Sequence, residues 1–327
     1  MNIRTALFAF SLLLAALPAA AQDAPAPAEP AKEAPAKAEA PATPAAPTYS
    51  RKGADTCLNC HGDDAVTMAI FNTKHAQPKN PNTPFGHGQL QCEACHGPGG
   101  AHTGRVPRGQ TRPPVVYFGR NTVTPIAQQN EMCLACHNPK AGEWHASAHR
   151  DNDVGCADCH QSHVARDPVL AKATQGDVCG TCHQVQKQNM LLPFAHPLRD
   201  EQMGCTGCHS PHGSTTQAAL TKDTVNDTCY TCHADKRGPF LWEHQPVSED
   251  CGLCHQPHGS VHPGMVKQRS PFLCQQCHQS QGHPAVPGLP SALPGGAPSA
   301  TALAAGCANC HSQVHGSNHP SGRQLMR

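Results

Sequence analysis

The sequence predicts an elongated fold of loops and short α-helices, with little or no β-structure and no ordinary hydrophobic core. All twenty cysteines fall into ten repeats of the pattern Cys-x-x-Cys-His. Aromatic residues make up only 4% of the chain and charged residues 14%. The segments between the repeats contain Gly, Pro, Asn and Ser in place of long periodic apolar patterns. Something other than apolar side chains must therefore fill the interior.

Each Cys-x-x-Cys-His repeat predicts one covalently attached haem c. The two thiols add across the vinyl groups of a porphyrin, and the adjacent histidine binds the iron as its proximal ligand. Zinc sites, thioredoxin-like pairs and disulfide frameworks also use spaced cysteines, but none of them requires a histidine after every second cysteine. We therefore predict a multihaem cytochrome c wrapped around a chain of ten haems. The attaching cysteines are Cys57, Cys60, Cys92, Cys95, Cys133, Cys136, Cys156, Cys159, Cys179, Cys182, Cys205, Cys208, Cys229, Cys232, Cys251, Cys254, Cys274, Cys277, Cys307 and Cys310, and the proximal histidines are His61, His96, His137, His160, His183, His209, His233, His255, His278 and His311.

The first part of the chain has the features of an export signal. Arg4, an apolar stretch over residues 6–17 and Ala19-Ala20-Ala21 predict a signal peptide over residues 1–21 and hence a periplasmic protein. Residues 22–48, almost wholly Ala and Pro, predict a disordered tether. The decahaem domain is expected over residues 49–327, where no segment has the ~20 apolar residues of a lipid-spanning helix. A net charge of +1 without Lys/Arg runs is evidence against nucleic-acid or lipid-surface partners.

The histidines outside the motifs predict a second axial ligand for every iron. Of the 24 histidines, ten end the motifs and fourteen lie elsewhere. Three central units repeat the order motif, histidine, motif, histidine, and the last histidine follows the second motif by three residues. We expect that histidine to reach a neighbouring haem, since it is too close in sequence to reach the far face of its own. The candidate distal ligands are His75, His102, His149, His163, His196, His212, His244, His258, His283 and His315.

This arithmetic predicts five two-haem repeats with bis-histidine ligation. His87, His145, His262 and His319 are left over, although spacing alone does not separate His319 from His315 or His145 from His149. An iron with imidazole on both faces has no open position for a substrate, so it serves one-electron exchange. We therefore predict an electron-transfer protein and no enzyme.

Several phrases resemble the decahaem cytochromes of the Mtr, Mto and Pio outer-membrane electron conduits. The likeness covers essentially all of residues 50–327 and is clearest at residues 225–234, 241–244, 273–278 and 310–322. It implies a periplasmic wire inserted into a porin-like outer-membrane β-barrel. The implied redox partners are periplasmic c-type cytochromes on one side and extracellular iron, metal oxide or a surface multihaem cytochrome on the other, with the direction of flow undetermined. The resemblance also implies an alternative division into two five-haem halves.

Two other functions remain open at this stage. A soluble periplasmic shuttle feeding a reductase would differ from the conduit only in its partners, as in the related decahaem partner of extracellular sulfoxide reductases. A multihaem reductase would instead keep one iron open. A haem that binds carbon monoxide in the native protein would indicate the reductase.

Overall fold

The structure is a computed structural model that describes residues 46–138, 141–278 and 306–326. The chain divides into two units at Ala46, and all of the motifs belong to the second, Pro47–Arg327. The predicted signal peptide, nearly all of the predicted tether and the distal candidate His283 lie outside the described residues.

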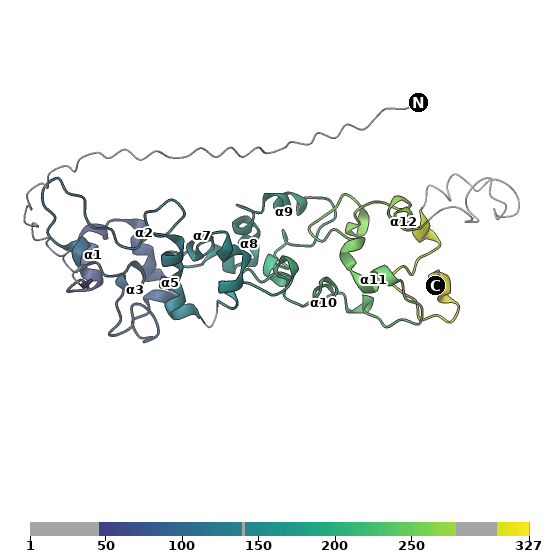
Figure 1. Cartoon of the computed structure of the whole chain (residues 1–327), viewed down its shortest axis with the longest axis horizontal. Helices are drawn as coiled ribbons and strands as arrows, with labels where there is room; N and C mark the ends of the chain where they lie inside the picture. Colours follow the sequence, from purple (N-terminus) through teal and green to yellow (C-terminus); the bar gives the residue numbers. More distant parts are fainter. Residues whose placement is uncertain (1–45, 139–140, 279–305, 327) are drawn as a thin grey trace, which may run out of the picture. The chain divides into compact units, whose positions relative to one another are not determined.

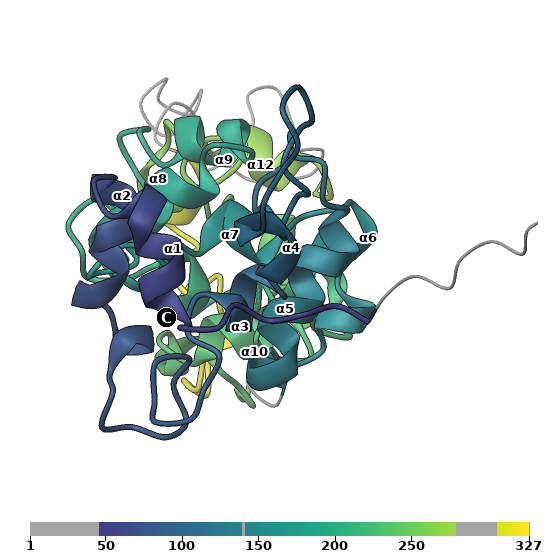
Figure 2. The same cartoon turned by 90° about the vertical axis from the view of Figure 1, so that its left-hand side faces the viewer.

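Short helices joined by loops form the second unit, which confirms the predicted fold class. Figure 1 shows the helices that it labels following one another from α1 to α12 along the long axis of this unit, and Figure 2 shows the same unit from the end that carries α1. They are α1 (Ala54–His61), α2 (Ala65–Met68), α3 (Glu93–His96), α4 (Gly100–Thr103), α5 (Ile126–His137), α6 (Ala148–Asp151), α7 (Cys156–Cys159), α8 (Lys172–Cys179), α9 (Gln184–Asn189), α10 (Val225–Tyr230), α11 (Gln245–Glu249) and α12 (Phe272–Gln275). The 3₁₀ turns are η1 (Ala69–Asn72), η2 (Lys74–Ala76), η4 (Trp144–Ala146), η5 (Pro168–Leu170), η6 (Cys205–Gly207), η7 (Gln217–Ala219), η8 (Ala234–Lys236), η9 (Cys251–Leu253), η10 (Pro263–Met265), η11 (Cys307–Asn309) and η12 (Gly322–Gln324).

The described residues form isolated β-bridges, such as Phe194 with Ser260, and no strand. None of the helices in this part of the chain is both long enough and apolar enough to cross a membrane. The longest, α5, has 12 residues.

The motifs adopt one turn of helix each. The backbone N–H of His160 donates to the carbonyl of Cys156 at 2.8 Å, and the equivalent bond is 2.9 Å long at His96 and 3.0 Å at His255. Because residues four apart lie on one face of a helix, this turn brings the first cysteine and the histidine to the same side. The first motif of each predicted pair lies in or at the end of α1, α5, α8, α10 or α12, and the second lies in α3, α7, η6, η9 or η11.

Apolar side chains supply almost none of the core. In the described part of the chain the buried apolar residues are Ala54, Ile70, Val116 and Trp144. Full burial of such a side chain is worth about 1.5–3 kcal/mol, whereas ordering each backbone residue costs about 1–2 kcal/mol. The interior is instead a continuous cavity of about 5280 Å³, lined by all twenty motif cysteines and all ten motif histidines. Pockets for one small ligand rarely exceed about 1,000 Å³, so this cavity has room for a series of large groups.

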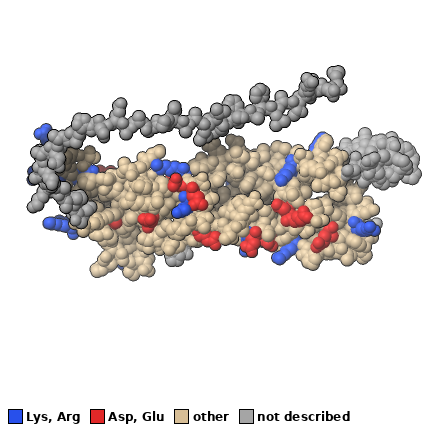
Figure 3. Space-filling model, in the orientation of Figure 1, with Lys and Arg blue, Asp and Glu red and all other residues tan. Residues whose placement is uncertain are grey.

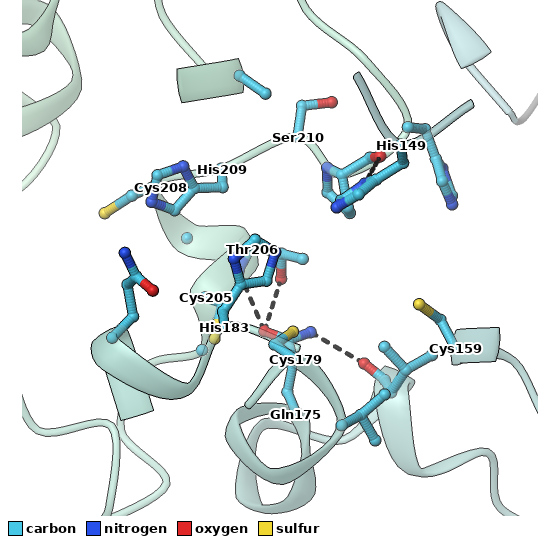
Figure 4. A pocket seen from close by; sticks show the side chains of 18 of the residues that line it. His149, Cys159, Gln175, Cys179, His183, Cys205, Thr206, Cys208, His209 and Ser210 are labelled. Atoms are coloured by element: carbon cyan, nitrogen blue, oxygen red, sulfur yellow. Dashed lines mark hydrogen bonds between the residues drawn. The ribbon is translucent and has the colours of Figure 1, made fainter. Parts of the chain in front are cut away.

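Polar side chains clamp the two motifs of a pair together. The side-chain oxygen of Asn226, one turn before Cys229, accepts the backbone N–H of Cys251 at 2.7 Å. Gln175, one turn before Cys179, accepts the N–H of Thr206 at 3.0 Å (Figure 4). Asn130 with Cys156, Ser270 with Cys307 and Gln91 with Ala54 complete the series. Each clamp satisfies an N–H group at the start of a motif turn that has no partner within that turn.

Glu93 ties the beginning of the described chain to the second motif. This residue is only 5% exposed, and its carboxylate accepts the N–H and Oγ–H of Ser50 at 2.9 and 2.7 Å and the N–H of Gly99 at 2.6 Å. Alanine would leave these donors unpaired, at about 1–3 kcal/mol for each that stays buried. We expect Glu93→Ala to lower the calorimetric melting temperature by several degrees. Glu131→Ala, at an exposed glutamate of α5, is the control, and equal melting temperatures for the two variants would contradict this role.

Candidate haem sites

Each of the nine described distal candidates faces one motif histidine across the cavity. The ring centroids of the nine pairs lie between 5.9 and 6.5 Å apart. The pairs are His61 with His102, His75 with His137, His96 with His163, His149 with His183, His160 with His212, His196 with His233, His209 with His258, His244 with His278 and His255 with His315.

This separation fits an iron between two imidazoles. Two metal–nitrogen bonds of about 2.0 Å, plus about 1.1 Å from each nitrogen to its ring centre, add up to about 6.2 Å. The angle between the ring planes varies from 15° for His255 and His315 to 88° for His75 and His137. A constant distance with a variable angle is expected for two ligands that rotate independently about one axis, so the residues present fit a haem at each position.

Backbone carbonyls orient many of these rings by accepting a hydrogen bond from Nδ1. Among the motif histidines, the Nδ1 group of His96 donates to Val116 O at 2.8 Å and that of His255 to Gly264 O at 2.7 Å. Among the distal candidates, His149, His196 and His244 donate to Pro211, Pro257 and Val314 at 2.8, 2.8 and 3.0 Å. With Nδ1 engaged, Nε2 remains as the nitrogen that can bind a metal.

Burial keeps several of these imidazoles neutral. Desolvation holds the pKa of His75, His96, His212, His258 and His315 below its ordinary value. Removing a side chain from water disfavours its charged form, and only the neutral imidazole has a lone pair for iron. The electrostatics of the cavity therefore favour the ligating form.

Cysteines of successive motifs lie close together. Within a predicted pair the first cysteines of the two motifs are neighbours, and between pairs the second cysteines are. Within the first pair, the thiols of Cys57 and Cys92 lie within hydrogen-bonding reach. The first cysteines of the other pairs also meet, in the combinations Cys133 with Cys156, Cys179 with Cys205, Cys229 with Cys251 and Cys274 with Cys307.

Between pairs, the second cysteines are the neighbours. Burial raises the pKa of the Cys95 thiol, and the nearby thiol of Cys136 raises it further. The same proximity joins Cys159 with Cys182, Cys208 with Cys232 and Cys254 with Cys277. Each motif therefore adjoins the motifs before and after it in sequence, at the positions where the thioether bonds would form.

Apart from His61 with His102, each described ring pair joins a motif histidine to a histidine that follows a motif two places away in sequence. His75, which follows the first motif, faces His137 of the third, and His163, which follows the fourth, faces His96 of the second. Histidines three residues beyond a motif histidine thus face a motif other than their own.

The structure also places the alternatives that spacing left open. His149 faces His183 and His315 faces His255. The Nδ1 atom of His319 instead accepts the N–H of Ser321 at 3.2 Å. Within the described ranges, His87, His145 and His262 form no ring pair with a motif histidine.

Three turns of sequence His-Gly-Ser link neighbouring ring pairs. Gly213, Gly259 and Gly316 have φ angles of +116°, +136° and +128°, in the region that favours glycine. A Cβ atom on Gly259 would collide with the backbone carbonyl of Asn189. In the turn that contains Gly259, Pro257 precedes His258. The carbonyl of Pro257 orients the ring of His196 by accepting a hydrogen bond from its Nδ1. Each turn therefore presents its own histidine and also orients a histidine that faces another motif.

Sequence reasoning missed the clamping amides and the linking role of these glycines. It also missed Asp167, whose carboxylate accepts a hydrogen bond from Nδ1 of His160 at 2.7 Å. The recurrence of Asn three residues before the first cysteine, at Asn130 and Asn226, is a signal that could have revealed the clamps. No disulfide joins any of the cysteines. In the described part of the chain, no group of three or more His, Cys, Asp or Glu side chains could hold a bare metal ion.

A shell of loops around one cavity, with haem-attachment motifs and facing imidazoles on its walls, defines a multihaem c-type cytochrome. Such a protein binds haem c and transfers electrons. The chain matches the family described as a doubled CXXCH motif at residues 196–238 and 244–283, and the cytochrome c-type protein NrfB-like family at residues 92–175.

The chain belongs to the MtrA family. It is 46% identical over 282 residues to multihaem cytochrome MtrA of Shewanella baltica, which covers 85% of this chain and 83% of the relative. It is also 30% identical over 163 residues to cytochrome c-type protein NrfB of Escherichia coli O6:H1, covering 47% of this chain and 79% of that protein. A protein of the same name from Haemophilus influenzae is 26% identical over 151 residues, covering 40% and 65%.

Proposed function

We propose that this chain is a bis-histidine decahaem wire that carries electrons across the outer membrane inside a porin-like β-barrel partner. Its redox partners would be periplasmic c-type cytochromes on one side and extracellular iron, metal oxide or a surface multihaem cytochrome on the other. The observation that carries the proposal is the series of facing histidine pairs along one cavity that every motif lines. Bound haem c would supply one-electron redox chemistry.

The twenty motif cysteines would attach ten haems, and the histidine pairs would hold nine of the irons. Two distal candidates fall outside the pattern in which a histidine faces a motif two places away. One follows the second motif and the other follows the ninth. The first of these, His102, faces His61. By the same symmetry we assign His283, which lies outside the described residues, to His311.

Hydrogen bonds to backbone carbonyls would keep both imidazoles of a pair in a fixed orientation. The carbonyl acceptors at Val116, Gly264 and Pro257 fix ring orientation, so the imidazoles need not move when an electron arrives or leaves. The alternating cysteine contacts would bring the edges of successive porphyrins close together. Two imidazoles per iron leave no substrate position, so we propose electron transfer without catalysis.

The surface supports enclosure by a protein partner. On the face shown in Figure 3, the charged side chains stand in small separate groups among uncharged residues. Large apolar side chains that do not line the cavity are also exposed, among them Leu241 (59%), Val185 (64%) and Val123 (76%). Exposed apolar surface is typical of sites that contact another protein. Residues 1–21 would direct export, and residues 22–48 would tether the domain of residues 49–327 in the periplasm.

Reconstitution tests this proposal. The chain would be co-purified with a co-expressed porin-like barrel and placed in liposomes that enclose an oxidised redox dye, with a membrane-impermeant reductant outside. We expect the dye to be reduced only when both proteins are present. Controls are barrel alone and chain alone.

Other outcomes would identify the competing functions. If no complex forms and the free chain passes electrons directly to a reductase, the chain is a soluble shuttle. If the free chain binds carbon monoxide at one haem, the multihaem reductase is favoured.

A further inference from the structure

One motif histidine has an acceptor unlike those of its counterparts. The second motif of each predicted pair ends in His96, His160, His209, His255 or His311. Four of these donate from Nδ1 to a backbone carbonyl, at 2.7 or 2.8 Å, on Val116, Ala218, Gly264 or Gln324. His160 instead donates to the carboxylate Oδ2 of Asp167 at 2.7 Å.

The structure holds Asp167 firmly in this position. Its side chain is only 14% exposed, and its Oδ1 accepts the N–H groups of Val169 and Gln161, both at 3.3 Å. The first of these bonds caps η5, so the carboxylate is fixed by the turn that follows the motif. Asp167 forms no ion pair with Lys or Arg among the described residues, whereas nearby Asp158 pairs with Arg120 at 3.1 Å. Its negative charge is therefore directed at the imidazole.

A carboxylate acceptor makes an imidazole a stronger electron donor. It pulls the Nδ1 proton, which raises the basicity of Nε2 and strengthens the bond to a metal on that side. Ferric haem carries one more positive charge than ferrous haem, so a stronger donor and a nearby negative charge both favour the ferric state. A backbone carbonyl exerts the same effect more weakly because it carries no net charge.

We propose that Asp167 tunes the haem attached at Cys156 and Cys159, giving it the lowest reduction potential among the five haems held by the second motif of each pair. This inference rests on the bis-histidine ligation proposed above, here by His160 and His212. In the redox step, one electron from an external mediator converts ferric to ferrous iron, and no bond to iron or to Asp167 is made or broken. Asp167 acts through His160 and is a positioning residue.

The test is Asp167→Asn in the full ten-haem chain without any barrel. Asparagine keeps the shape and a possible acceptor oxygen but removes the charge. We expect the equilibrium constant for reducing one haem to rise about tenfold, which is 59 mV for a one-electron couple. Potentiometric titration followed by electron paramagnetic resonance resolves this shift in one low-spin ferric signal. Asp167→Glu should restore most of the low potential.

Asp158→Asn is the matched control, because it removes a carboxylate from the same motif that touches no histidine. We expect less than a third of the shift there. An unchanged titration in Asp167→Asn, or an equal shift in both variants, would overturn the proposal. Ten attached haems by mass spectrometry verify that each variant is loaded. If this haem is high-spin before substitution, bis-histidine ligation fails instead, and failure of barrel insertion leaves the titration unaffected.

Discussion

Replacing His258 with alanine is expected to leave one haem iron with a single imidazole while all ten haems stay attached. The ring of His258 faces that of His209 at 5.9 Å, with the planes only 16° apart. Alanine offers no ligand, whereas Cys205 and Cys208 still form the covalent bonds. The lost bond should convert one low-spin iron to a high-spin, five-coordinate iron with an open position.

Carbon monoxide binding to the reduced protein measures this change directly. We expect one equivalent to bind per chain in His258→Ala and none in the unsubstituted protein. Mass spectrometry should still give ten haems. His262→Ala is the control, since His262 lines the same cavity four residues further on and forms no pair with a motif histidine in the described part. Its spectrum should be unchanged.

Two results would contradict this account. An unchanged spectrum in His258→Ala would mean that another residue supplies the ligand opposite His209. Carbon monoxide binding in the unsubstituted protein would mean that one iron is open from the start. The first result would remove one assigned ligand, and the second would favour the reductase.

The sequence predicts the fold class well because haem attachment is local chemistry. Five consecutive residues, such as Cys205 to His209, determine a covalent site without reference to the rest of the chain. The distal candidates are less local, yet repetition identifies them, since His212 and His258 stand in nearly identical phrases. Threefold recurrence of the His-Gly-Ser turn is a stronger signal than any single histidine.

What each histidine faces depends on packing between distant segments. His75 faces His137 and not His96, although the latter is nearer in sequence. Nothing in the composition of those segments distinguishes the two partners. The groups that accept hydrogen bonds from the histidine rings are equally hard to predict from the sequence. Asp167 has no distinctive sequence context, and only the fold, through η5, places it beside His160.

Gly259→Ala is expected to disturb two haems at once and to destabilise the whole unit. The glycine has φ +136°, and an added Cβ would collide with the backbone carbonyl of Asn189. Relief of the clash must move His258 on one side and weaken the bridge from Ser260 to Phe194 on the other. Backbone strain and clash together should cost about 2–4 kcal/mol.

Two haems are involved because the turn serves two ring pairs. His258 itself faces His209, while the carbonyl of Pro257 orients His196, which faces His233. A displaced turn should therefore open the irons at both His209 and His233. We expect up to two equivalents of carbon monoxide to bind, against one for His258→Ala, and a clearly lower melting temperature.

Gly109→Ala separates the clash from the strain of the backbone angle. Gly109 also has a positive φ, +87°, but nothing lies within 4 Å of the position that its Cβ would occupy. That variant should lose about 1 kcal/mol of stability, the usual cost of this conformation, and should keep all irons low-spin. If Gly259→Ala opened only one haem, the carbonyl of Pro257 would not be needed to hold His196. If it behaved like Gly109→Ala, the His-Gly-Ser turn would be a passive loop and not a shared support for two ligands.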